Sequence, residues 1–311
     1  MINIRSLCFS AVSMVVLAAC ANTKPAQNST VANNSVSALS PAITSSANLA
    51  LVENPLHGDL FASAHTGISI YDLSDGRSLF EYQADKYFLP ASNTKLFTLY
   101  AALKYLPDSL PGIRYDNSGD SLFIYPTGDP SFLHPEFRKN PVVDFLKKGR
   151  KPIVMVTSAW NDQALGKGWS WDDYNDDYMA ERSAFPVYGN VIRWYQVSQK
   201  NTQPEVPDSM QTFVFSEPEV NWKVRFNDDR FNQIFAVKRK KDENVFQISQ
   251  GKELKSEVDI PFVTNGVASA LELLKDTVGK QITERMESRP AVLSVIFSQP
   301  RDTLLQKMMY R

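Results

Sequence analysis

Ser92 and Lys95 are the two side chains of this 311-residue chain whose types and spacing suggest covalent chemistry. They lie three residues apart, so on a helix they would share one face. A serine hydroxyl is a poor nucleophile until a base removes its proton, and a lysine amine that burial and neighbours keep neutral can be that base. The pair therefore predicts nucleophilic catalysis, with Ser92 as the nucleophile and Lys95 as the base.

The residues around the pair favour a helix that would carry both side chains. Pro90 ends an extended stretch, and apolar residues recur at helical spacing behind it, at Leu96, Leu99, Tyr100 and Leu103. Such a stripe is typical of an amphipathic helix, here with the serine in its first turn. A serine in that place can also be only a helix cap beside a solvated lysine, and this alternative stays open.

The same spacing occurs again at Ser249-Gln250-Gly251-Lys252, so the motif alone is weak evidence. This second match follows a strand-like run, residues 245–248, and it contains a glycine, which indicates a turn. On a turn the serine and the lysine would not share a face. We therefore place the predicted chemistry at Ser92.

Further segments of the chain, taken in order, resemble one peptidase family. They are residues 67–73, Pro90-Ala91-Ser92-Asn93-Thr94-Lys95, Gly128-Asp129-Pro130, residues 168–173, and Ser298-Gln299-Pro300 ahead of Asp302. From about residue 60 to Arg311 the chain resembles the S13 family, which are low-molecular-mass penicillin-binding proteins of the D-alanyl-D-alanine carboxypeptidase/endopeptidase type. Ser-x-x-Lys is the first motif of such enzymes.

The resemblance implies a substrate and a course of reaction. Ser92 would attack the carbonyl of the penultimate D-alanine of a peptidoglycan stem peptide, Lys95 would take its proton, and water would hydrolyse the acyl-enzyme. β-Lactams would acylate the same serine of a full-length enzyme of this type. No metal or organic cofactor is implied.

The resemblance also selects Asp173 and Tyr178, which follow Trp171-Asp172. In family members that take meso-diaminopimelate peptides, the corresponding acid and aromatic help to recognise the free amino end of the side chain. A carboxylate beside an aromatic ring suits an ammonium group. The alternative is that Trp169 and Trp171 belong to the core and that the acids form a solvated turn.

Two other short motifs have structural explanations. His65-Thr66-Gly67 resembles the third motif of serine β-lactam-binding enzymes, but it precedes the nucleophile instead of following it, and we interpret it as the start of a strand. Tyr188-Gly189-Asn190 resembles a Tyr-x-Asn second motif, but it leads directly into a strand-like run and predicts a turn.

The amino terminus predicts export to the cell envelope. Residues 1–19 have a basic start and a short apolar stretch, which is typical of a signal peptide. Leu17-Ala18-Ala19-Cys20 resembles a bacterial lipobox, so Cys20 is the predicted lipidation site of a periplasm-facing, membrane-anchored protein. The alternative is an ordinary secretory peptide cut near Ala19. Residues 20–48, rich in Ser, Asn, Ala and Thr, predict a flexible tether.

Composition excludes several classes of function. The only cysteines are Cys8 and Cys20, so the folded part offers no thiol nucleophile, disulfide or cysteine-ligated zinc. The three histidines lack metal-site spacing, which argues against a zinc peptidase or a Ser-His-Asp triad. The net charge of −1 and the lack of a basic stripe give no support for nucleic-acid binding.

The pattern of strands and helices predicts an α+β fold. The resemblance to the S13 family implies a partial serine β-lactamase/transpeptidase-like domain at residues 49–116, interrupted by a large, mostly-β insertion at 117–295 and resumed at 296–311. Expected strands are 67–73, 77–83, 121–125, 152–158, 191–198, 211–215, 234–238, 245–249 and 292–297, and expected helices are 142–148, 266–280 and one near 303 that Asp302 caps.

The chain departs from the family at its end. In S13 members a segment like residues 298–305 continues into a Ser-Asp-Asn motif, and a Lys-Thr-Gly motif comes far downstream. Neither follows here, and Ser46-Ala47-Asn48 lies in the tether. We therefore expect an amino-terminal portion of an S13-type enzyme with little or no activity, whose Ser92 helix lacks part of its packing. The alternative is a non-catalytic envelope lipoprotein whose insertion binds peptidoglycan or a partner protein.

Overall fold

The computed structural model describes residues 63–200, 210–227, 233–286 and 293–310. The chain divides into two compact units, Met1–Ala101 and Ala102–Arg311. The predicted signal peptide, the lipidation site Cys20 and the tether lie outside the described residues. Within the described ranges, no helix combines the length and the apolar character that crossing a bilayer requires.

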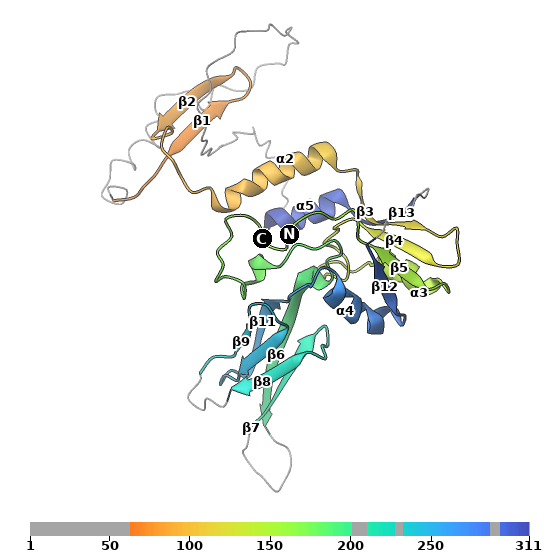
Figure 1. The fold of residues 1–311 in the computed structure, drawn as a ribbon. Helices are drawn as coiled ribbons and strands as arrows, with labels where there is room; N and C mark the ends of the chain where they lie inside the picture. Colours follow the sequence, from red (N-terminus) through yellow and green to blue (C-terminus); the bar gives the residue numbers. More distant parts are fainter. Residues whose placement is uncertain (1–62, 201–209, 228–232, 287–292, 311) are drawn as a thin grey trace, which may run out of the picture. The chain divides into compact units, whose positions relative to one another are not determined.

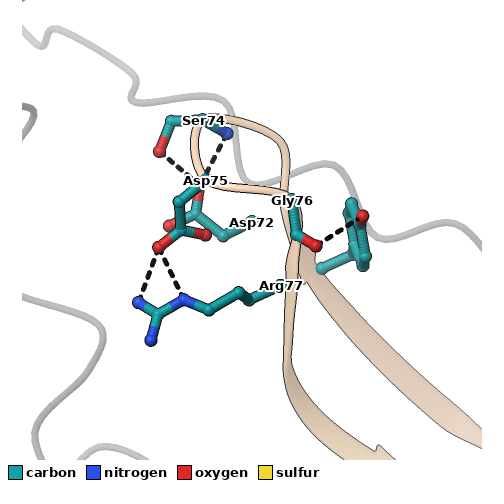
Figure 2. Close-up of polar contacts among 6 residues, drawn as sticks. Asp72, Ser74, Asp75, Gly76 and Arg77 are labelled. Carbon is teal, nitrogen blue, oxygen red and sulfur yellow. Dashed lines mark hydrogen bonds and ion pairs between the residues drawn. The ribbon is translucent and has the colours of Figure 1, made fainter. Parts of the chain in front are cut away.

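The first unit contains a β-hairpin, formed by β1 (Ile68–Asp72) and β2 (Arg77–Tyr82) (Figure 1). Its turn is held by local hydrogen bonds (Figure 2): the Asp72 carboxylate accepts the backbone N–H of Ser74 at 2.8 Å and the Ser74 hydroxyl at 2.6 Å. These bonds hold the pKa of Asp72 below its ordinary value. Gly76 closes the turn at a φ of 72°, which glycine adopts without steric cost. The predicted hairpin is confirmed.

The second unit is built around a five-stranded mixed sheet with the order β12-β5-β4-β3-β13 (Figure 1). β4, β5 and β12 are parallel neighbours, whereas β3 is antiparallel to both β4 and β13. β5 is buried throughout, as expected for a strand that is covered on both faces. The strands are β3 (Ser109–Asp116), β4 (Leu122–Pro126), β5 (Ile153–Val156), β12 (Ile282–Arg285) and β13 (Ser294–Pro300).

Two three-stranded sheets complete the second unit, with the orders β11-β6-β7 and β8-β10-β9. They share one core with the helices α3 (Pro141–Lys148) and α4 (Ala268–Val278). In that core the ring of Trp194 packs 5.0 Å from Phe246, centroid to centroid. The strands are β6 (Val191–Lys200), β7 (Met210–Glu217), β8 (Lys223–Asn227), β9 (Ala236–Arg239), β10 (Val245–Ser249) and β11 (Lys255–Pro261).

The prediction of an α+β fold is confirmed, as is every expected strand and helix at about its expected place. One correction concerns α5 (Arg301–Tyr310), which begins before Asp302, so Asp302 lies in the first turn and does not cap the helix from outside. Ser249-Gln250-Gly251-Lys252 does not lie on a helix, as predicted, because the chain leaves β10 at Ser249 and continues as irregular structure.

Four strands had not been predicted. β3 contains Pro111 and Gly112, which normally argue against a strand, but Pro111 lies where β3 pairs irregularly with β13. β8, β11 and β12 are rich in charged residues, and each has at most two large aliphatic or aromatic side chains, so their strand signal is weak. These strands form because their neighbours supply hydrogen-bond partners, which local sequence does not reveal.

The backbone of Gly251 is held so closely by its neighbours, among them the buried Gln196, that we expect it to tolerate no side chain. The Gln196 amide accepts the Gly251 N–H at 2.8 Å and donates to the carbonyl oxygens of Gly251 and Glu253 at 3.2 and 3.0 Å. A Cβ on Gly251 would lie 2.6 Å from the carbonyl carbon of Ile234. We expect Gly251→Ala to lower the free energy of unfolding by about 2 kcal/mol, measured by urea denaturation.

Gly149→Ala is the matched control, since a Cβ there meets nothing within 4 Å. We expect it to change the free energy of unfolding by less than about 0.5 kcal/mol. Equal effects of the two substitutions would contradict the close packing around Gly251.

Candidate active site

Ser92 lies in a tight turn that leads into the first helix. Residues Ala91–Thr94 form the 3-10 turn η1, and α2 (Lys95–Tyr105) continues from it. The Asn93 N–H donates to the Pro90 carbonyl at 2.8 Å, and the Thr94 hydroxyl donates to the Ala91 carbonyl at 2.9 Å. The helix that was predicted behind Pro90 is therefore present, but its first turn is a separate 3-10 turn.

Ala91 has a left-handed backbone, with a φ of 43°. A residue with a Cβ pays about 1–2 kcal/mol for this conformation, and such strain concentrates at functional sites. Here it falls on the residue directly before Ser92. Nothing in the sequence indicated it, because alanine carries no preference for this conformation.

Ser92 lies in η1 and Lys95 is the first residue of α2, a spacing of three residues at which side chains of helical turns are neighbours. Ser92 is exposed and Lys95 is half-buried. Among the residues that the structure describes, no hydrogen bond joins the Ser92 hydroxyl to the Lys95 amine. The structure thus keeps the two residues within one turn of the chain, with no hydrogen bond between their side chains.

The apolar stripe of α2 is present but not covered. No residue of α2 is buried, and its exposed apolar side chains include Leu96, Phe97, Tyr100 and Leu103. Each large apolar side chain left in water forgoes roughly 1.5–3 kcal/mol of burial free energy. At the other end of the helix, the Arg301 guanidinium donates to the Leu106 carbonyl at 3.0 Å, which satisfies a free helix-end acceptor.

Asp173 and Tyr178, the second predicted pair, meet in the second unit. The Tyr178 hydroxyl donates to the Asp173 carboxylate across a series of turns that ends in η2 (Asp177–Met179). The alternative that Trp169 and Trp171 belong to the core is wrong. Trp171 is 70% exposed, with the Lys241 amine 5.3 Å from its ring centroid, and Trp169 is 39% exposed.

Arg239 anchors this loop, and sequence reasoning missed it. Its buried guanidinium donates to the carbonyl oxygens of Pro261 at 2.7 Å, Lys240 at 2.6 Å and Tyr174 at 3.2 Å. Its backbone N–H donates to Asn175 at 2.7 Å. Burial lowers the pKa of Arg239 below its ordinary value. One guanidinium thus ties the Asp173–Tyr178 loop to the ends of β9 and β11.

The hydrogen bond to Asp173 raises the pKa of Tyr178 to about 12. Since the folded-state pKa exceeds the ordinary value of about 10, the interaction stabilises the fold below pH 10 and is lost as the pH rises through about 12. We expect Asp173→Ala to lower the pKa of Tyr178 toward 10. Ultraviolet titration of tyrosinate measures the pKa of Tyr178, once the titration curve of Tyr178→Phe has been subtracted. An unchanged pKa in Asp173→Ala would contradict the bond.

The two remaining motifs have the structural roles that were predicted. His65 precedes β1, and its ring stacks on Phe88 with centroids 4.3 Å apart. Tyr188–Asn190 forms the short turn η3 ahead of β6. Asn190 is buried there, and its amide donates to the Glu181 carbonyl at 2.8 Å. Neither motif contributes a free reactive group.

Comparison with known proteins gives one consistent result. The sequence model of the D-Ala-D-Ala carboxypeptidase 3 (S13) family matches residues 50–311. A curated relative, D-alanyl-D-alanine carboxypeptidase DacB of Haemophilus influenzae, is 23% identical over 278 residues. That alignment covers 79% of this chain and 56% of the relative.

One solved structure supports the fold. The crystal structure of penicillin binding protein 4 (dacB) from Haemophilus influenzae matches with a TM-score of 0.54 at 18% identity, covering 78% of this chain and 58% of that chain. A second structure of that protein, complexed with a novel β-lactam, matches with a TM-score of 0.49 at 17% identity and covers 78% and 57%. The chain therefore spans a little over half the length of the relatives it matches.

Proposed function

Because the chain belongs to the D-Ala-D-Ala carboxypeptidase 3 (S13) family, we propose that it carries the nucleophile of a serine-type D-alanyl-D-alanine carboxypeptidase/endopeptidase that acts on peptidoglycan stem peptides. The observation that supports the proposal is the Ser92–Lys95 pair at the start of α2, in a turn where the residue before Ser92, Ala91, is strained. An exposed hydroxyl on a tight turn before a helix is accessible to a polymer substrate.

Ser92 is the nucleophile of the reaction, and Lys95 transfers the protons. The Lys95 amine accepts the Ser92 proton while the Ser92 oxygen attacks the carbonyl carbon of the penultimate D-alanine. The bond to the terminal D-alanine breaks, and the departing amine takes a proton from Lys95. Water then hydrolyses the ester and restores Ser92. A β-lactam carbonyl reacts with the same oxygen, so β-lactams are covalent inhibitors of the reaction.

Asp173 and Tyr178 form the receptor for the free amino end of the stem peptide in this proposal. An ammonium group can bind the second oxygen of the Asp173 carboxylate while it lies against the Tyr178 ring, which is 65% exposed. The Arg239 anchor supports the proposal, because it fixes the loop that presents both groups. Cleavage before Cys20 and its lipidation would hold the enzyme at a membrane, facing the periplasm.

The 311-residue polypeptide taken by itself is expected to react slowly. Its sequence contains no Lys-Thr-Gly motif, and Ser-x-Asn occurs only at residues 46–48. In the family these motifs supply a proton relay and an oxyanion donor, and the loss of one such donor costs about 10²–10³ in rate. The exposed α2 and the uncoupled Ser92 hydroxyl are consistent with this expectation.

Labelling with fluorescent penicillin tests the proposal. The protein isolated from its source cells and the 311-residue polypeptide are labelled in parallel, and the adduct is located by mass spectrometry of peptides. We expect an adduct on the peptide that contains Ser92, formed at least about 10²-fold more slowly on the polypeptide. An adduct elsewhere would overturn the role of Ser92. No adduct on either sample, with retention on peptidoglycan, would favour the non-catalytic lipoprotein.

A further inference from the structure

The sheet β11-β6-β7 has one face in the core and one face outside it. Ile192, Trp194 and Gln196 of β6 are buried, so the alternate residues of this strand point outward. The antiparallel register places three rows side by side on the outer face. They are Asp259, Arg193 and Glu217; then Glu257, Tyr195 and Phe215; then Lys255, Val197 and Phe213.

Two aromatic rings stack against each other in the middle of this outer face. Tyr195 and Phe215 stack with centroids 5.0 Å apart and ring planes 17° apart. Phe215 is 49% exposed, and Phe213, two residues away on the same strand, is 42% exposed. Exposed apolar side chains that gather on one face, with polar groups around them, mark a binding surface.

Charged groups with fixed positions border the rings. The Arg193 guanidinium makes two hydrogen bonds of 2.7 Å to the Asp259 carboxylate, and the Tyr195 hydroxyl donates to Glu217 at 3.0 Å. These contacts raise the pKa of Arg193 above its ordinary value, so the group stays charged. Carboxylate oxygens and guanidinium N–H groups on the border can bind hydroxyl and amide groups of a ligand.

A cavity extends from this outer face toward the Asp173–Tyr178 loop. It has a volume of about 420 Å³ and lies between β6, β11 and residues 175–178. Tyr178 lines it together with Arg193, Glu257 and Asp259. The outer face is therefore continuous with the loop that presents the Asp173–Tyr178 pair.

We propose that this face binds the glycan strand of peptidoglycan, a polymer of N-acetylated amino sugars. A pyranose ring has an apolar C–H face that can pack against the exposed side of the Tyr195–Phe215 stack, while its hydroxyl and acetamido groups reach the charged border. The acids of the border and cavity, which are Asp176, Asp177, Glu217, Glu257 and Asp259, outnumber the cations Arg193 and Lys255. This charge disfavours phosphate polymers and accepts a neutral sugar chain.

The inference rests on the proposed function, because a stem peptide held at Asp173 and Tyr178 remains attached to its glycan. The cavity joins the outer face of the sheet to the Asp173–Tyr178 loop, so a glycan on that face would lie next to its own stem peptide. The face would thus hold the glycan whose stem peptide binds at Asp173 and Tyr178.

The experiment measures binding of the full chain to uncharged N-acetylglucosamine oligomers immobilised on beads, which present the ring faces and acetamido groups of the glycan strand. The double variant Tyr195→Leu with Phe215→Leu keeps apolar volume but removes both rings. We expect it to bind about tenfold more weakly than the unaltered chain. Phe226→Leu is the matched control, since Phe226 is 60% exposed on β8 of the other sheet. We expect it to bind like the unaltered chain.

Equal affinity of the double variant and the unaltered chain for the sugar chain would overturn the proposal. The proposal would also be overturned if the unaltered chain bound immobilised stem peptides but no sugar chain. If circular dichroism shows that the double variant is unfolded, Phe215→Leu on the edge strand β7 replaces it, with a loss of at least about threefold expected. Penicillin labelling of Ser92 needs no glycan. Failure of glycan binding and failure of the peptidase proposal are therefore separate outcomes.

Discussion

Replacing Ser92 by alanine is expected to remove the penicillin adduct from the protein expressed in its source cells, with a loss of at least about 10³-fold in the rate of acylation. Alanine lacks the oxygen that forms the ester, whereas the turn Ala91–Thr94 is held by hydrogen bonds of Pro90, Ala91, Asn93 and Thr94 and stays intact. The measurement is fluorescent labelling in gels, with intact mass as a second readout.

The chain supplies its own control for this result. Ser249→Ala alters the second Ser-x-x-Lys match, which leaves β10 without forming a helix, so labelling should stay unchanged. Lys95→Ala should slow acylation by at least about 10²-fold, because it removes the base and keeps the nucleophile. Persistent labelling of Ser92→Ala, or loss of labelling in Ser249→Ala, would assign the nucleophile to another residue.

Arg239→Met is expected to lower the free energy of unfolding of the second unit by about 3 kcal/mol. Methionine fills much of the same volume but donates no hydrogen bond. The carbonyl oxygens of Pro261, Lys240 and Tyr174 would then lose their partner in a buried place. The loop that carries Tyr178 would also lose its anchor, so the pKa of Tyr178 should move toward 10.

Arg225→Met is the matched control for Arg239→Met. Arg225 is exposed on β8, so the same exchange there should cost less than about 0.5 kcal/mol. Urea denaturation followed by tryptophan fluorescence compares the two variants. Similar losses at both positions would show that Arg239 does not hold the loop.

Sequence patterns predicted this fold wherever local chemistry and tertiary structure agree. The β1–β2 hairpin was predictable because alternating residues flank Asp75-Gly76, and α3 and α4 because their apolar faces match a core. β3 was not predictable, since its pairing with β13 outweighs the presence of Pro111.

The candidate site was predictable only in part, for a similar reason. Spacing selected Ser92 and Lys95, but it could not reveal the strained backbone of Ala91. Asp173 and Tyr178 were selected by family resemblance, and the bond between them depends on turns that no pattern encodes. Arg239 was missed because a charged residue on a strand is usually solvated, and its carbonyl partners are distant in sequence.

The order of strands in the large sheet determines when that sheet can assemble during synthesis. Ile153 of β5 pairs with Ile282 of β12, and Arg114 of β3 pairs with Val295 of β13. Both edges of the sheet can therefore form only after residues 282–300 have been synthesised. Until then β3 and β5 present unsatisfied hydrogen-bonding edges, which are prone to join other chains. Nascent protein of this topology should fold slowly, and its yield in cells should depend on chaperones.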